Sequence, residues 1–238
     1  MIFSVYMATV SRRMDSSPWT DLPLFPLNTV LFPGMVLPLH VFEERYKLMI
    51  NRCLEEERPF GVLLIRVGKE VGGFSVPYQV GTTTQIAAVS RLDDGRMNVI
   101  SIGSERFRLR ALRYNQPYLV GDAEPWPLLG ASTEQARDQV GPMRALFHQY
   151  LSLLAQAQGH KIEIEEIPSE PRILAILIAI GLQLPMPQKQ RLLDQPTVPH
   201  LLLAERAILK REQLLLNYMI QTQTQQWEGG YSGYLANS

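Results

Sequence analysis

Short apolar or alternating runs, separated by Gly, Pro and Asp, dominate the first half of the chain. Alternation of apolar and polar side chains with a period of two is typical of β-strands that have one buried face. Between two of these runs, Asp94-Gly95 supplies the positive φ angles of a tight turn, which predicts a hairpin over residues 91–98. The runs that predict strands span residues 22–31, 60–67, 80–92, 97–102, 106–114 and 118–123.

One helix is expected within this strand-rich region, over residues 40–58. Residues three or four positions apart share a face of a helix. On the outer face, Glu43 and Lys47 are placed to form an ion pair. The apolar residues that share the inner face are Phe42, Tyr46, Met49 and Cys53.

In the second half of the chain the apolar period changes to about 3.6 residues, which is typical of helices. Ser132 and Gln135 form a capping-box pattern that opens the first of them. Phe147 and Tyr150 lie on its apolar stripe, so we expect both to be buried. Further helices are predicted over residues 169–182, 188–194 and 197–222.

This order of elements predicts an α+β fold with two structured parts. Residues 21–125 form a β-rich subdomain with an inserted helix, and residues 126–222 form an α-helical bundle. Residues 1–20 are expected to be a flexible extension. Residues 223–238, biased towards Gln, Gly and Ser without an apolar period, are expected to be a disordered tail.

The composition is that of an ordinary globular protein, with 46% hydrophobic and 19% charged residues. Basic and acidic residues number 23 each, so a domain-wide attraction to nucleic acid or anionic lipid is not expected. The single cysteine, Cys53, excludes an intrachain disulfide and favours a reducing, cytoplasmic location. The longest apolar run, residues 173–182, is about half of what a membrane span requires. The first apolar residues precede the basic ones, the reverse of a secretory signal, and Met14 is the expected natural start.

Motifs of known catalytic chemistry are absent from the sequence. It contains no GxxxxGK[ST] phosphate loop, no HExxH, no GxSxG and no GxGxxG. The four histidines lie far apart, and Cys53 belongs to an apolar stripe, where a thiol is typically inert. We therefore expect no enzymatic activity, no catalytic residue, no metal and no cofactor.

The most informative segment is LPLFPLNTVLFPGMVLPLHVFEERYKLMI, residues 22–50. It resembles the opening motif of the Lon protease N-terminal (substrate-binding) domain family. Further matching motifs follow in the family's order, namely Val80-Gly81-Thr82, Asp94-Gly95-Arg96, Ile102-Gly103-Ser104-Glu105-Arg106-Phe107-Arg108 and Tyr118-Leu119-Val120. The resemblance implies a PUA-like pseudo-barrel followed by a helical subdomain, in a stand-alone member that lacks the ATPase and peptidase domains.

Most residues of the matching motifs have an architectural interpretation. Prolines fix φ and are excluded from the interior of a sheet, whereas glycines enter turns that other residues avoid. Glu43 is favoured near a helix start by the helix dipole. The residues interpreted as structural are Pro26, Pro33, Gly34, Phe42, Glu43, Arg45, Tyr46, Gly81, Gly103, Arg106 and Phe107.

The resemblance implies recognition of unfolded or exposed apolar polypeptide segments, in an adaptor-like or chaperone-like role that a separate protease or ATPase would complement. Extended peptides are held by strand edges and apolar pockets, without catalytic residues. The glycine-flexible, apolar stretch at residues 72–78 suggests where such contacts lie. The candidate peptide-binding residues are Met35, Phe74, Val76, Pro77 and Tyr78.

The alternative is an RNA-binding PUA-like protein. Arginines alternate with apolar residues over residues 106–113, so several guanidinium groups share one strand face and could contact phosphates. The zero net charge argues against this alternative, and acidic neighbours such as Glu105 and Asp122 would weaken it further. The candidate nucleic-acid contacts are Arg106, Arg108, Arg110 and Arg113.

Overall fold

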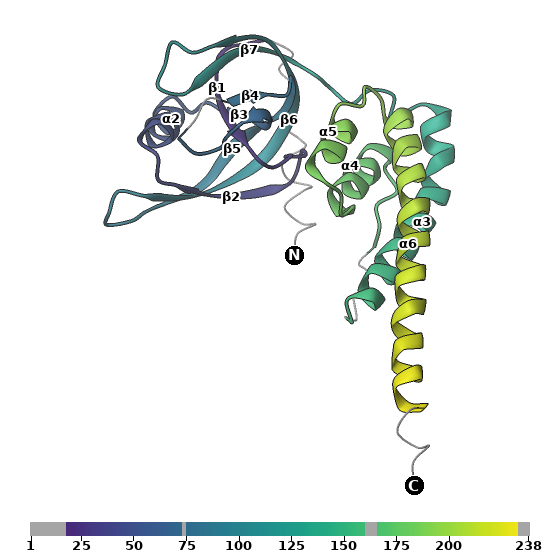
Figure 1. Ribbon diagram of the computed structural model, residues 1–238. Coiled ribbons are helices and arrows are strands. Elements are labelled where there is room, and N and C mark those ends of the chain that lie inside the picture. Colours follow the sequence, from purple (N-terminus) through teal and green to yellow (C-terminus); the bar gives the residue numbers. More distant parts are fainter. Residues whose placement is uncertain (1–17, 73–74, 160–165, 233–238) are drawn as a thin grey trace. The chain divides into compact units, whose positions relative to one another are not determined.

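The computed structural model describes residues 18–72, 75–159 and 166–232 (Figure 1). The chain divides into two compact units. The barrel unit comprises the chain up to Leu128 together with Gln183–Pro196, and the helical unit comprises Leu129–Leu182 and the chain from Thr197 onward. The α+β class predicted from the sequence is confirmed, with seven strands and five helices in the described ranges.

The barrel unit is built on a sheet that closes on itself. Its path runs β1-β7-β6-β5-β3-β4, and an additional parallel pairing of β1 with β3 closes a ring of five strands. Two strands are not part of this ring. The short strand β4 pairs with β3 at the end of the path, and β2 pairs with β6. The strands are β1 (Trp19–Leu27), β2 (Val36–Val41), β3 (Phe60–Gly68), β4 (Ser75–Pro77), β5 (Val80–Arg91), β6 (Met97–Arg113) and β7 (Leu119–Pro125).

The predicted strands are present, but their bounds and number need correction. The first was predicted to run to residue 31 and ends at Leu27. The two runs at 97–102 and 106–114 form one continuous strand, β6, and β2 and β4 were not predicted. The predicted hairpin between β5 and β6 is confirmed, since Gly95 has φ +80° and Leu92 N–H donates to the Arg96 carbonyl at 2.9 Å. β1 begins at Trp19, whose ring packs edge-on against Phe107 at 6.5 Å, so the predicted flexible extension ends earlier than residue 20.

Two glycines of the matching motifs bring the loop before β2 against β6. Gly34 has φ +82°, a conformation that side chains disfavour, and its N–H donates to the Gly103 carbonyl at 2.8 Å. In return, Gly103 N–H donates to the Met35 carbonyl at 2.9 Å. A Cβ on Gly103 would lie 2.5 Å from the Phe32 carbonyl oxygen, so only glycine permits this approach.

Helix α2 (Glu44–Glu55) lies beside the barrel strands (Figure 1) and contributes Tyr46, Met49 and Cys53 to the main core cluster. The Tyr46 ring stacks on Phe25 with centroids 4.0 Å apart. The predicted helix began too early, because residues up to Val41 extend as β2, and Phe42 is exposed.

The predicted ion pair between Glu43 and Lys47 is wrong. Glu43 instead accepts from Arg45 at 2.9 Å, and Lys47 pairs with Glu44. Glu43 lies before the first helical turn, and its carboxylate also accepts from Gly72 N–H. Through hydrogen bonds to the loop after β3, the motif residues Glu43 and Arg45 hold this loop at the start of α2.

Helix α5 (Met186–Leu193) belongs to the barrel unit, although the sequence prediction placed it in the helical part. Gln190, which is buried, donates from Nε2 to the Val80 carbonyl at 3.0 Å. Pattern along the chain cannot reveal this, because the partner strand lies 110 residues earlier.

The helical unit contains α3 (Glu134–Ala157), α4 (Pro171–Gly181) and α6 (Val198–Ser232). Phe147 and Tyr150 are buried, as predicted. The side chains that cap α3 and α4 are Thr133 and Glu170, each one residue after the serine expected from the sequence. None of the helices in the described ranges is long and apolar enough to cross a membrane.

The predicted disordered tail is wrong in its first part, because the backbone of 223–232 continues α6. Extending an existing helix needs no new nucleation, so a segment without its own apolar stripe is able to remain helical. Residues 1–17 and 233–238, which hold the rest of the predicted termini, lie outside the described residues.

Candidate functional site: a pocket in the barrel unit

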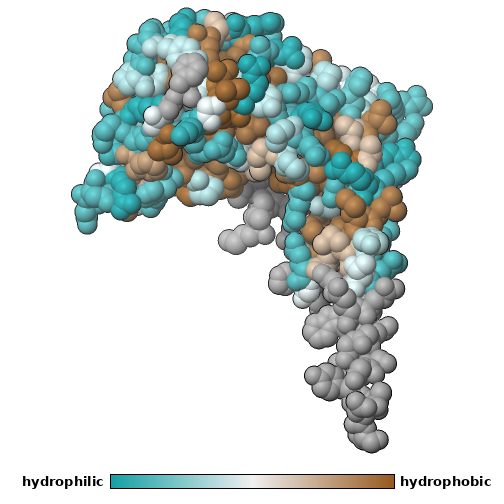
Figure 2. Space-filling view, viewed as in Figure 1, coloured by the Kyte–Doolittle hydropathy of each residue, from teal (hydrophilic) through white to brown (hydrophobic). Residues whose placement is uncertain are grey.

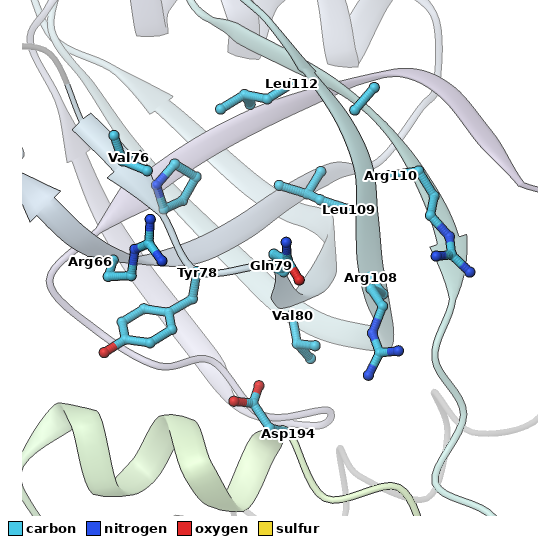
Figure 3. A pocket seen from close by; sticks show the side chains of 12 residues that line it. Arg66, Val76, Tyr78, Gln79, Val80, Arg108, Leu109, Arg110, Leu112 and Asp194 are labelled. Carbon is cyan, nitrogen blue, oxygen red and sulfur yellow. The ribbon is translucent and has the colours of Figure 1, made fainter.

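A pocket of about 470 Å³ opens within the barrel unit (Figure 3). It is formed where the β4–β5 connection, the second half of β6 and the residue after α5 meet. Leu109 N–H donates to the Gln79 carbonyl at 2.8 Å, which holds two of these walls together. The lining residues are Arg66, Val76, Pro77, Tyr78, Gln79, Val80, Arg108, Leu109, Arg110, Ala111, Leu112 and Asp194.

The apolar part of the lining comes from β4 and β6, with Val80 at the start of β5. Val76 and Pro77 lie on β4, and Leu109 and Leu112 lie on β6. The β6–β7 register shifts between Leu109 and Ala111, which marks a bulge at this point. A bulge changes the direction of the following side chains, so apolar residues on both sides of it reach the same hollow.

Arg108 supplies a positively charged edge to the pocket. Its Cζ lies 3.3 Å from the centroid of the Trp126 ring, so the guanidinium lies over the face of the indole. Arg66, on β3, also lines the pocket, and it is exposed. Within the described part of the chain, neither arginine forms an ion pair with a carboxylate.

Two other arginines of β6 form ion pairs with carboxylates. Arg110 forms an ion pair with Glu124 on β7, and Figure 3 shows its side chain pointing away from the space between Tyr78, Arg108 and Asp194. Arg113 pairs with both Asp21 and Asp122. These carboxylates neutralise two of the four arginines proposed as nucleic-acid contacts.

The fourth, Arg106, is buried rather than presented to solvent. Its Nη1 donates to the carbonyls of Leu193, at 2.6 Å, and Gln195, at 2.7 Å. The two carbonyls flank Asp194, so Arg106 fixes the backbone that carries this lining carboxylate. We correct its interpretation as a nucleic-acid contact, because the chain after α5 covers the guanidinium.

Asp194 is the acidic group of the pocket. Burial raises the pKa of its carboxyl, and the hydrogen bond from Gln190 Nε2, at 2.7 Å, together with Arg108 and Arg106, opposes that rise. Burial and the neighbouring guanidinium groups thus act on this carboxyl in opposite directions.

Three of the five candidate peptide-binding residues meet in this pocket, namely Val76, Pro77 and Tyr78. Met35 does not line it, because its side chain packs against the main core cluster and its Sδ accepts from Phe32 N–H. Phe74 lies outside the described residues. The sequence analysis missed Arg66 and Asp194, since no motif links positions so far apart.

A second apolar surface lies on α6 of the helical unit. Five large apolar side chains of this helix are exposed, and Leu214 is the most exposed, at 73%. Figure 2 shows apolar surface on this unit, interspersed with hydrophilic side chains. We call Leu203, Leu214, Leu215, Tyr218 and Met219 the α6 patch.

Reactive or metal-binding groups do not gather at either surface. In the ranges that the structure describes, no three His, Cys, Asp or Glu side chains are grouped to hold a metal ion. Cys53 is buried in the barrel core, and burial raises its pKa to about 11. A thiol with that pKa stays protonated near neutral pH and is a poor nucleophile.

The chain thus combines a closed barrel that carries a lined pocket with a three-helix unit. A family model described as the ATP-dependent protease La (LON) substrate-binding domain matches residues 21–211. The chain belongs to this family.

Relatives and solved structures agree with this assignment. Lon protease 1 of Thermus thermophilus is 31% identical over 203 residues, which cover 81% of this chain and 25% of that protein. Lon protease 2 of Myxococcus xanthus is 28% identical over 176 residues, or 73% of this chain and 21% of that protein. The chain thus spans about a quarter or less of the length of these relatives.

The Lon N-terminal domain protein from Xanthomonas campestris superposes with a TM-score of 0.61 at 27% identity, covering 79% of this chain and 98% of that chain. The N-terminal domain of a Mycobacterium avium complex Lon protease shares the fold, with a TM-score of 0.60 at 17% identity and coverage of 82% and 98%. The predicted resemblance to the Lon N-terminal domain is confirmed.

Proposed function

We propose that this protein is a non-catalytic module that recognises unfolded or exposed apolar segments of polypeptides. The observation that carries the proposal is the pocket of the barrel unit, whose Val76, Pro77 and Leu109 offer apolar contacts beside polar groups. Pockets of this mixed lining are typical of ligand sites. Membership of the substrate-binding-domain family supports a polypeptide as the ligand.

The α6 patch supports the same proposal. Contiguous exposed apolar surface on a protein commonly marks an interaction site. Leu214 and Tyr218 are four residues apart, so they lie on the same face of α6 and offer one continuous contact. An unfolded chain is long enough to contact several such sites, each of them weakly.

We further propose that bound polypeptides are passed to a separate protease or ATPase, in an adaptor-like or chaperone-like role. The relatives named above are Lon proteases, and the family model that matches this chain is described as a substrate-binding domain. Capture of clients by one module and processing by another requires no reactive group in the first.

The RNA-binding alternative has weaker support. It needs a basic face, yet Arg106 is buried, and Arg110 and Arg113 are paired with carboxylates. Ion pairing at the surface lowers the local potential that attracts phosphates. Arg66 and Arg108 are the arginines left to attract an anion at the pocket.

A titration of the full chain with a permanently unfolded protein, reduced and carboxymethylated α-lactalbumin, tests the proposed function. We expect binding in the micromolar range or weaker, because the disordered partner loses conformational entropy on docking. The native, disulfide-bonded form should bind at least tenfold more weakly. Affinity should change little between low and high salt, whereas phosphate-led binding would fall steeply.

Matched variants locate the contact. Val76→Ser should weaken binding, whereas Val36→Ser, at an exposed valine on β2, should not. Leu214→Ser tests the α6 patch in the same way. Equal affinity for unfolded and native α-lactalbumin would contradict the proposed function.

A further inference from the structure

We propose that the pocket of the barrel unit binds the carboxyl terminus of a polypeptide whose last side chain is apolar. This inference rests on the proposed function and names the part of the client that the pocket takes.

The guanidinium of Arg108 is preorganised to bind a carboxylate. Its guanidinium is stacked on Trp126 at 3.3 Å, which restricts its rotation and leaves the N–H edge available for in-plane hydrogen bonds. A carboxylate accepts two parallel N–H bonds from such an edge. Figure 3 shows the Arg108 side chain extending from β6 toward the end of the pocket where Asp194 lies.

The charges of the lining favour an anion over a cation. Arg66 and Arg108 are positive, and Arg110 is neutralised by Glu124. Asp194 is the opposing charge. A negative ligand therefore meets two guanidinium groups against one carboxyl group.

An apolar wall lines the same pocket as these cations. Val76 and Pro77 lie on β4, which pairs with β3 at the two residues that flank Arg66, and Leu109 of β6 lines the pocket together with Arg108. A carboxyl terminus carries its carboxylate on the same Cα as its last side chain. It is therefore suited to place a carboxylate on Arg108 and an apolar side chain against this wall together.

The size of the pocket favours a chain end over a continuous segment. A volume of about 470 Å³ lies within the usual range for small ligands. One or two terminal residues fill such a volume, whereas an internal Asp or Glu would require the chain to enter and leave it.

The test compares two fluorescein-labelled ten-residue peptides that end in Leu-Leu, one with a free carboxylate and one with a carboxamide. Fluorescence anisotropy with the full chain should show that the amide weakens binding about tenfold or more, as expected for a lost charge-assisted hydrogen bond. Arg108→Gln should weaken binding of the acid to the level of the amide, and Arg108→Lys should restore it in part. Arg113→Gln, on the same strand but outside the pocket, should leave the difference between the two peptides intact.

Asp194→Asn should change the affinity for the acid peptide in the direction opposite to Arg108→Gln. The amide oxygen retains an acceptor for Gln190, and loss of the negative charge should strengthen binding of the acid but not of the amide. A purely structural role for Asp194 would weaken both peptides alike. Thermal unfolding of each variant shows whether it has folded.

The outcomes are distinguishable. Equal affinity for the acid and the amide, with unfolded α-lactalbumin still bound, overturns the carboxyl-terminus proposal and leaves the proposed function standing. Failure to bind either peptide and unfolded α-lactalbumin overturns both. Tighter binding of a short 5′-phosphorylated RNA than of the acid peptide, lost in Arg108→Gln, overturns the inference in favour of a nucleic-acid ligand.

Discussion

The guanidinium of Arg106 donates a hydrogen bond of 2.6 Å to the main-chain carbonyl of Leu193, 87 residues later in the chain. A second bond reaches the Gln195 carbonyl, so one buried cation holds both sides of Asp194. A strand of the barrel thereby fixes the end of α5 and with it the acidic edge of the pocket. The same arginine lies in the segment 102–108, one of those that resemble the Lon N-terminal domain family.

Arg106→Gln should lower the free energy of unfolding by about 2–4 kcal/mol, because two buried carbonyls lose a charged donor. Urea denaturation followed by circular dichroism measures this. Arg113→Gln is the control, since its ion pairs are partly exposed and contribute about 1 kcal/mol or less. Equal losses in the two variants would show that Arg106 does not hold the segment after α5.

The close approach of Gly103 to the backbone of Phe32 gives a second stability prediction. Gly103→Ala should be strongly destabilising, by about 2 kcal/mol or more, because its Cβ would meet a carbonyl oxygen at 2.5 Å and the main chain has to shift. Gly141→Ala, in α3 with no atom within 4 Å, should be neutral or stabilising by up to about 1 kcal/mol. Thermal unfolding of both variants checks the prediction, which fails if the two substitutions have the same sign and size.

In the helical unit, Phe147→Ala should cost about 3–5 kcal/mol of stability. The Phe147 ring is buried and contacts the backbone at Gly181, where a Cβ would lie 2.8 Å from it. Leu214→Ala, which removes an exposed side chain, should change stability by about 0.5 kcal/mol or less. An unchanged melting temperature in Phe147→Ala would show that the register of α3 is wrong.

Local pattern predicted the elements whose signals lie within a few residues. Asp94-Gly95 places the β5–β6 hairpin correctly, and the stripe of α2 correctly identifies Tyr46, Met49 and Cys53 as core. The last two residues of β2, His40 and Val41, were taken for the start of a helix because they lead directly into the stripe of α2, and the rest of β2 was not predicted.

The pocket was predicted only in part, because its walls come from distant segments. Val76, Pro77 and Tyr78 were singled out for flexibility and apolarity, but Asp194 joins them only through the fold. Arg106 was expected on a solvated face, since alternation along β6 cannot show that the chain after α5 covers it.

We expect the purified protein to hydrolyse neither ATP nor unfolded casein. The sequence contains no phosphate loop, and the thiol of Cys53 is buried with its pKa raised to about 11. Phosphate release and casein fluorescence assays test this after repeated chromatography. Turnover that survives purification and is abolished by a point substitution in this chain would contradict the expectation.

The core of the barrel unit makes stability sensitive to alkaline pH. Burial raises the pKa of Tyr46 from 10.0 to about 12 and that of Cys53 from 9.0 to about 11. Above pH 9 the unfolded chain releases these protons while the folded protein retains them, so the free energy of unfolding should fall as pH rises from 9 to 12. Urea titrations at stepped pH measure the fall, and Tyr46→Phe should flatten it above pH 10, where the tyrosine of the unfolded chain ionises. An identical slope in this variant would show that Tyr46 ionises as readily in the folded protein as in the unfolded chain.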